Sequence, residues 1–130
     1  AKRDWGHAKD YIEGMYLILQ QDKPEDFVLA TGVTTTIRDF VKMSFLELGI
    51  QLEFRGENET EEGFIVENKG DYSLDIGSVV VRVSSIYYRP TEVDLLIGDP
   101  TKAIEKLGWK PKYDLPTLVK EMVESDLSNA

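Results

Sequence analysis

The sequence predicts a small mixed α/β fold without a complete doubly wound parallel sheet. Short apolar runs alternate with amphipathic helical segments along the chain. The strand-like segments between Leu52 and Ile86 are polar and are separated by turn residues, which favours a small antiparallel sheet. A length of 130 residues is typical of one domain. We therefore expect residues 1–130 to form one domain that buries a core without metal or disulfide cross-links.

The first two helices are predicted from apolar spacing and from their end signals. The first covers residues 8–20 and is followed by Lys23-Pro24, a typical helix stop. Its expected buried face carries Ala8, Tyr11, Ile12, Met15 and Leu19. The second helix is expected at Ile37–Leu48. Thr36 is a suitable N-cap for it, Asp39 completes a pair resembling a capping box, and Gly49 follows its end.

The other elements follow from short apolar runs and turn residues. In chain order we expect a buried strand at Phe27–Ala30, a strand at Leu52–Phe54, a solvated acidic loop at Gly56–Gly63, strands at Phe64–Val66 and Val79–Ile86, an extended segment at Val93–Ile97, and helices at Thr101–Leu107 and Leu115–Leu127.

Composition excludes several classes of function. The formal net charge of -9 argues against nucleic acid, whose binding depends on clustered Lys and Arg, and no basic patch suits a membrane surface. Cysteine is absent, so a disulfide framework, a thiolate nucleophile and a cysteine-ligated zinc site are excluded. His7 is the only histidine, and the acidic residues form no ordered calcium loop. We therefore expect no metal site.

The first residues of the chain bear on its expected location and on whether it is a fragment. Residues 1–10 are charged, and no apolar run is long enough to span a bilayer, so we expect a cytoplasmic protein. The chain does not begin with Met and opens inside a motif. We therefore expect it to be a fragment of a longer gene product.

Arg3 and Arg89 are candidates for binding a phosphorylated ligand. A guanidinium can hold two oxygens of a pyrophosphate with parallel charged hydrogen bonds. Glu92 follows Arg89-Pro90 closely, and its carboxylate can accept hydrogen bonds from a pair of ribose hydroxyls. Surface ion pairs are the alternative: Arg3 with Asp4 or Asp10, and Arg89 with Glu92.

Five other conspicuous residues have structural interpretations. Trp5 and Trp109 are expected to pack, Trp5 as a core anchor before the first helix. His7 lacks a paired nucleophile and is expected to position that helix. Asp10 is expected to cap or orient this region through backbone hydrogen bonds. Arg38 is expected to face water or a neighbouring carboxylate.

Motifs at both ends of the chain resemble those of the GDP-mannose 4,6-dehydratase family of extended short-chain dehydrogenases/reductases. The motifs are Arg3-Asp4-Trp5-Gly6-His7-Ala8-Lys9-Asp10-Tyr11, Tyr87-Tyr88-Arg89-Pro90-Thr91-Glu92-Val93-Asp94, Gly98-Asp99-Pro100-Thr101-Lys102-Ala103 and Lys106-Leu107-Gly108-Trp109-Lys110-Pro111. The joint presence of the first two is what distinguishes this family. The resemblance implies a C-terminal sugar-nucleotide-binding domain that lacks the family's N-terminal Rossmann domain.

The resemblance also implies a function. In this family GDP-mannose is converted to GDP-4-keto-6-deoxymannose by NADP-dependent internal redox and dehydration, and the arginines and glutamate matching Arg3, Arg89 and Glu92 bind the nucleotide. A Gly-rich loop and a Tyr-x-x-x-Lys pair are absent here. We therefore expect no catalytic or cofactor-binding residue in this chain, which by itself should be inactive. The intact enzyme is expected to be a homo-oligomer with NADP on the missing domain.

Two alternatives remain open at this point. The chain could be a fragment of another nucleotide-sugar epimerase or dehydratase. It could also be a free-standing, non-catalytic binding or interaction module that keeps the fold without the activity. An upstream reading frame encoding a Gly-rich loop would favour the enzyme fragment, and its absence would favour the module.

Overall fold

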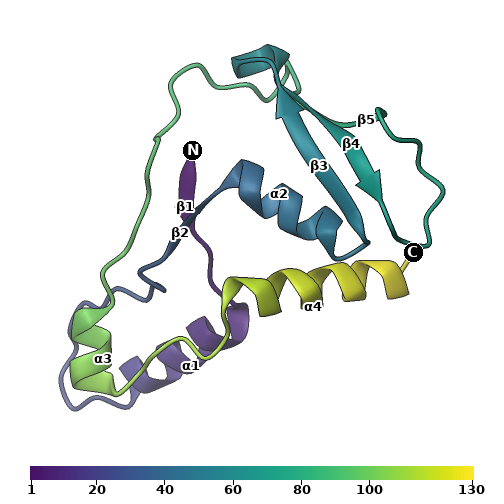
Figure 1. Cartoon of the computed structure of the whole chain (residues 1–130). Helices are drawn as coiled ribbons and strands as arrows, with labels where there is room; N and C mark the ends of the chain where they lie inside the picture. The colour runs from purple at the N-terminus through teal and green to yellow at the C-terminus, as the bar shows by residue number, and fades with distance from the viewer. The chain divides into compact units, whose positions relative to one another are not determined.

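The computed structural model describes all 130 residues and divides into two compact units. The first unit comprises Ala1–Ile37 and Val93–Ala130, and the second comprises Arg38–Glu92. Four α-helices and two small antiparallel sheets confirm the mixed α/β fold class (Figure 1). No helix is both long enough and apolar enough to cross a membrane.

The first unit contains β1 (Lys2–Asp4), α1 (Ala8–Leu19), β2 (Thr34–Thr36), α3 (Thr101–Leu107) and α4 (Leu115–Ser128). β1 pairs antiparallel with β2, and Arg3 lies opposite Thr35. On its other side, Lys2 forms an isolated parallel bridge with Leu95, which partly bears out the extended segment predicted at Val93–Ile97. The three consecutive threonines of β2 are β-branched and suit a strand, although this strand was not predicted.

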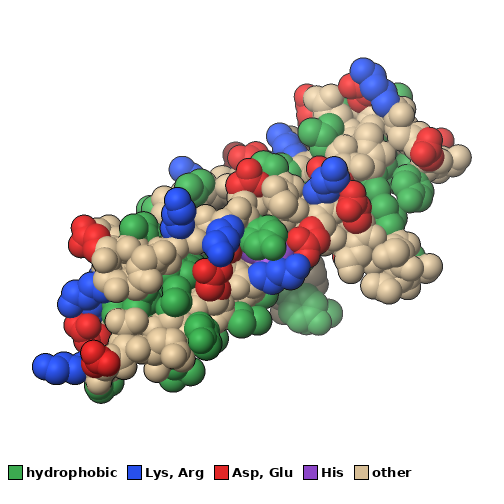
Figure 2. Space-filling view, turned by 90° about the horizontal axis from the view of Figure 1, so that it is seen from below, with side chains coloured by type: hydrophobic (Ala, Val, Ile, Leu, Met, Phe, Trp, Pro, Cys, Tyr) green, Lys and Arg blue, Asp and Glu red, His purple; other side chains and the backbone are tan.

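Helix α1 confirms the predicted range, but the predicted buried face is wrong. The side chains of Ile12, Met15 and Leu19 are 64%, 57% and 80% exposed. Asp10 and Gly14 are buried instead. The reason is that α1 packs through its smallest residue: a Cβ placed on Gly14 would lie within 3.2 Å of side-chain atoms of Leu29 and Trp109. On the face seen in Figure 2, hydrophobic side chains reach the surface between charged ones.

The strand predicted at Phe27–Ala30 is not formed. These residues have no strand partner in either sheet, and Val28 is 53% exposed. Ala30 is buried, and Gly98 lies so close to it that a side chain at 98 would clash. An apolar run predicts burial, but a strand also needs a neighbour that supplies ladder hydrogen bonds. No segment of this chain supplies them here.

The second unit is a three-stranded sheet with one helix. Strands β3 (Ile50–Arg55), β4 (Glu62–Asn68) and β5 (Val79–Arg82) pair antiparallel in that order, which confirms the predicted antiparallel excursion. Ile50, Leu52 and Ile65 form its core, and Val41 and Phe45 of α2 pack against it. β5 ends before the predicted Ile86 because the chain turns, with the N–H groups of Tyr87 and Tyr88 donating to the carbonyl of Ser84.

The remaining predictions differ from the structure mainly at element ends. Helix α2 (Ile37–Leu46) stops before Leu48, because the next residues form a tighter turn in which the N–H of Leu48 donates to the carbonyl of Phe45. The predicted acidic loop, Gly56–Gly63, contains a short 3₁₀ helix, η1 (Asn58–Thr60). Strand β4 begins at Glu62, before the predicted end of that loop. Helix α3 has the predicted bounds, and α4 extends one residue beyond its predicted end.

Candidate functional site

The Arg-Asp-Trp motif begins the candidate site, and Asp4 binds a turn that is distant in sequence. Its Oδ1 accepts hydrogen bonds from the N–H and the hydroxyl of Thr31, at 3.0 and 2.5 Å. Its Oδ2 accepts from the N–H of Gly32 at 2.8 Å. Gly32 has a φ of 76°, a left-handed conformation that glycine adopts without strain. Asp4 therefore fixes this turn against β1.

Arg3 is half-buried and contacts backbone. Its Nη1 donates to the carbonyl oxygens of Lys2 and Val93, each at 2.8 Å. The bond to Val93 supports the pairing of β1 with the following chain, in which the N–H of Leu96 donates to the carbonyl of Lys2 at 3.1 Å. The Nη1 group of Arg3 thus stabilises the backbone at Lys2 and Val93, a role that was not predicted from the sequence.

Arg89 and Glu92 lie in the second unit, after the Ser84 turn, and both are exposed. Arg3 lies in the first unit. The predicted joint role of these three side chains in nucleotide binding therefore stays a prediction. Arg38, by contrast, has the expected carboxylate neighbour, because its Nε donates to Glu61 Oε1 at 2.6 Å.

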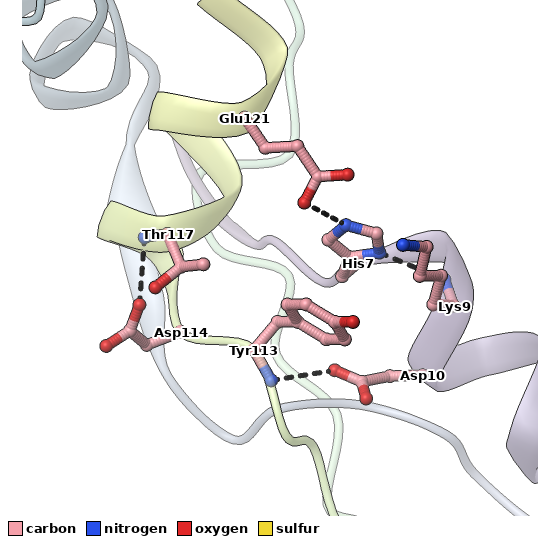
Figure 3. A network of polar contacts seen from close by, with 7 residues as sticks. All are labelled: His7, Lys9, Asp10, Tyr113, Asp114, Thr117 and Glu121. Atoms are coloured by element: carbon pink, nitrogen blue, oxygen red, sulfur yellow. Dashed lines mark hydrogen bonds and ion pairs between the residues drawn. The ribbon is translucent and has the colours of Figure 1, made fainter. Parts of the chain in front are cut away.

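Two further residues of the same motif, His7 and Asp10, lie at the start of α1 (Figure 3). His7 is the N-cap of α1, and its Nδ1 accepts the N–H of Lys9 at 3.0 Å. Its Nε2 lies 2.9 Å from Oε2 of Glu121 on α4. The imidazole stacks on Tyr113 with ring centroids 4.1 Å apart. His7 therefore positions the helix, as expected, and also joins it to α4.

Asp10 is 2% exposed and holds the chain that leads into α4. Its two carboxylate oxygens accept the N–H groups of Lys112 and Tyr113, each at 3.1 Å. Its own carbonyl accepts the indole N–H of Trp109 at 2.7 Å. Trp109 is 1% exposed, which confirms its predicted packing role. The backbone-orienting role predicted for Asp10 is confirmed as well.

Trp5 is less buried than a core anchor would be. Its side chain is half-buried, and its Nε1 donates to the carbonyl of Thr35 in β2 at 3.3 Å. Trp109, at 1% exposed, is the tryptophan that is fully buried in this unit. Trp5 thus helps to hold β2 beside β1.

The electrostatics of this region follow from its burial and its carboxylates. Burial, and then the charges of Asp4 and Asp10, raise the pKa of Tyr11 above its usual value. A hydrogen bond from Lys112 to Glu13 raises the pKa of the lysine. No buried side-chain nitrogen or oxygen lacks a hydrogen-bond partner. The network is therefore saturated and suited to holding backbone in place.

Sequence reasoning missed Glu121, Tyr113 and Thr31 as partners of the motif. Glu121 lies 114 positions from His7, and Thr31 lies 27 positions from Asp4. Periodicity and capping signals act over one or two helical turns, so they could not reveal such pairs.

Comparison with known proteins gives a consistent result. The family model described as GDP-mannose 4,6 dehydratase matches residues 1–122. The chain is 54% identical over 127 residues to a GDP-mannose 4,6 dehydratase of Dictyostelium discoideum, covering 98% of this chain and 33% of that protein. It is 53% identical to the human protein of that name, covering 98% of this chain and 32% of the relative.

A bacterial protein of the same name gives a similar match. The GDP-mannose 4,6-dehydratase of Vibrio cholerae is 48% identical over 132 residues, covering all of this chain and 36% of that protein. The chain thus spans about a third of the length of the curated relatives that it matches. Since the family model covers nearly all of its residues, the chain belongs to the GDP-mannose 4,6 dehydratase family.

Proposed function

We propose that this chain is the nucleotide-sugar-binding part of an enzyme that converts GDP-mannose to GDP-4-keto-6-deoxymannose by NADP-dependent internal redox and dehydration. The observation that carries the proposal is the match of residues 1–122 to the family model. Relatives that bear the dehydratase name and are about three times as long support it. The rest of such a polypeptide, GDP-mannose and further copies of the enzyme are the partners that we propose.

In this proposal Arg3, Arg89 and Glu92 bind the nucleotide. Arg89 is exposed and can form paired charged hydrogen bonds with pyrophosphate oxygens. Glu92 accepts hydrogen bonds from the ribose hydroxyls. Arg3 contributes a guanidinium whose Nη1 is anchored on the carbonyl of Val93, so its orientation is restricted before ligand binds.

The residues of this chain do not fit the NADP cofactor. A dinucleotide typically places its pyrophosphate at a helix N-terminus behind a Gly-rich loop. The first turns of α1 and α4 are already capped by the side chains of His7 and Asp114. The sequence has neither a Gly-x-Gly-x-x-Gly loop nor a Tyr-x-x-x-Lys pair. We therefore assign NADP and the hydride step to polypeptide outside this chain.

The activity is tested with the isolated chain and with the longer polypeptide that contains it. Each is incubated with GDP-mannose and NADP, and the nucleotide sugars are analysed by mass spectrometry. We expect the longer polypeptide to form a product that has lost one water, and the isolated chain to form none above a heat-killed control. Turnover by the isolated chain, or none by the longer polypeptide, contradicts the proposal.

The nucleotide site is tested in the longer polypeptide by calorimetric titration with GDP. We expect Arg89→Ala to weaken binding by about 1.5–3 kcal/mol, the range for hydrogen bonds to charged groups. Arg89→Lys should recover only part of this loss, because an ammonium group cannot form the paired contact. Arg38→Ala is the matched control, since Arg38 lies in the same unit and pairs with Glu61. Equal effects of the two alanine substitutions would contradict a specific role for Arg89.

A further inference from the structure

The segment Phe27–Ala30 is apolar at every position. Such an uninterrupted run is typical of a strand that lies inside a sheet and is covered on both faces. A strand with one face in water alternates apolar and polar residues instead. In this structure the segment belongs to neither sheet. It therefore has the sequence of an interior strand without neighbouring strands in this chain.

The side chains of the segment already have neighbours within the first unit. Leu29 lies against α1, where a Cβ on Gly14 would be 2.6 Å from its Cδ1. Val28 and Ala30 lie against Gly98, where a Cβ would be 3.2 Å from Val28 Cγ1 and 2.4 Å from the Cβ of Ala30. Alternate residues thus have different neighbours, as they do in an extended strand.

The main chain of the segment has no such neighbours. The N–H and carbonyl groups of Phe27–Ala30 form no hydrogen bond within the chain. The flanking residues are bound on both sides: the carbonyl of Asp26 accepts from Lys102 Nζ at 2.8 Å, and the N–H of Thr31 donates to Asp4. Main-chain polar groups of folded proteins are nearly always paired, so this segment differs from its surroundings.

We propose that Phe27–Ala30 becomes a sheet strand by pairing with a β-strand of polypeptide that lies outside this chain. An extended partner offers N–H and carbonyl groups at the spacing that the edge of this segment presents. Val28 is 53% exposed, and Phe27 and Leu29 are partly exposed, so such a partner can reach the segment.

The length of the relatives favours a partner from the same polypeptide. The chain spans only about a third of the curated relatives that it matches. A strand from the remaining two thirds would be covalently attached and present at high effective concentration. This inference rests on the longer polypeptide of the proposed function but not on its enzymatic activity.

The pairing is tested by hydrogen exchange with mass spectrometry on the isolated chain and on the longer polypeptide, both without ligand. The amides of Val28 and Leu29 should exchange quickly in the isolated chain. In the longer polypeptide at least one of them should exchange about 100-fold more slowly, because hydrogen bonds of a sheet open far less often than exposed amides. Equal exchange in the two proteins overturns the proposal, whether or not the longer polypeptide turns over GDP-mannose.

Two pairs of amides calibrate this comparison. Asp22 and Lys23 are exposed and should exchange quickly in both proteins. Lys112 and Tyr113 donate to the Asp10 carboxylate and should exchange slowly in both. The isolated chain is also measured over a range of concentrations. Slow exchange of the segment that grows with concentration overturns the proposal, because a second copy of the chain then supplies the strand.

Proline substitutions in the longer polypeptide test the main-chain groups directly. Successive residues of a strand direct their N–H groups to opposite edges, so Phe27→Pro and Val28→Pro each remove a donor from a different edge. At least one of them should abolish the slow exchange of the segment, while slow exchange of Lys112 and Tyr113 shows that the variant is folded. Phe27→Ala and Val28→Ala are the matched controls, since they remove the same side chains and keep the N–H groups. Slow exchange that survives both proline substitutions, or that is lost as fully in the alanine variants, overturns the pairing.

Discussion

The indole Nε1 of Trp109 donates a hydrogen bond of 2.7 Å to the carbonyl oxygen of Asp10, 99 positions away. Trp109 belongs to the chain between α3 and α4, and Asp10 lies in the first turn of α1. The bond therefore joins the two separate segments of the chain that build the first unit. Asp10 makes a second connection through its carboxylate, which binds the next stretch of backbone.

Removing the carboxylate of Asp10 should destabilise the fold. Asp10→Ala leaves the N–H groups of Lys112 and Tyr113 without their acceptor, and an unsatisfied buried group costs about 1–3 kcal/mol. Asp10→Asn keeps one acceptor oxygen and should cost less. Chemical denaturation of the chain measures both. Asp22→Ala, at an exposed position, is the control. An Asp10→Ala variant as stable as this control would show that the hydrogen bonds to the Asp10 carboxylate do not stabilise the fold.

Gly14→Ala should be destabilising although alanine favours helices by about 1 kcal/mol. The added Cβ would lie 2.6 Å from Cδ1 of Leu29 and 3.2 Å from Nε1 of Trp109, and overpacking costs about 1–3 kcal/mol. The steric term should prevail because Trp109 is anchored by its hydrogen bond. In a double-mutant cycle, Leu29→Ala should reduce the cost of Gly14→Ala. Additive effects of the two substitutions would rule out the contact.

Helix α4 should lose its N-terminal cap in acid. Hydrogen bonds from the hydroxyl and the N–H of Thr117 lower the pKa of Asp114 below its ordinary value. The pKa of Asp114 is lower in the folded chain than in the unfolded chain, where it is about 3.9. The ionised carboxylate therefore stabilises the fold fully above the unfolded pKa, and this stabilisation disappears as the pH falls through the folded pKa. The chemical shift of the Thr117 amide measures the loss. Asp114→Asn should keep the cap and remove this pH dependence, so a dependence that persists would point to another carboxyl group.

The exposed apolar stripe of α1 should contribute to association rather than to folding. Ile12, Met15 and Leu19 are all more than half exposed. We expect Met15→Glu and Leu19→Lys together to change the free energy of unfolding by less than about 0.5 kcal/mol for each substitution, and to reduce self-association of the isolated chain in sedimentation experiments. Val119→Lys is the contrast, because Val119 is 1% exposed and its replacement should unfold the unit. Strong destabilisation by the double variant would show that the stripe is needed for folding.

Elements with local signals at both ends were predictable from the sequence. Helix α3 has its predicted bounds because Pro100 precedes it and Gly108, with a φ of 65°, ends it. The first strand of the antiparallel sheet in the second unit was predictable because the alternating apolar residues Leu52 and Phe54 point to one face of a strand. Family motifs likewise singled out Arg3, Arg89 and Glu92, whose roles in binding remain proposals.

The sequence by itself therefore determined the fold class, most helices and the family, because these depend on neighbouring residues and on motifs. Only the tertiary structure decided which face of α1 is buried and what its polar residues bind. The stripe with Ile12 and Leu19 is the more apolar face, yet the helix packs where Gly14 allows Trp109 to approach. Close packing and hydrogen bonds between residues far apart in the sequence determine which face of α1 is buried. Neither produces a periodic pattern in the sequence.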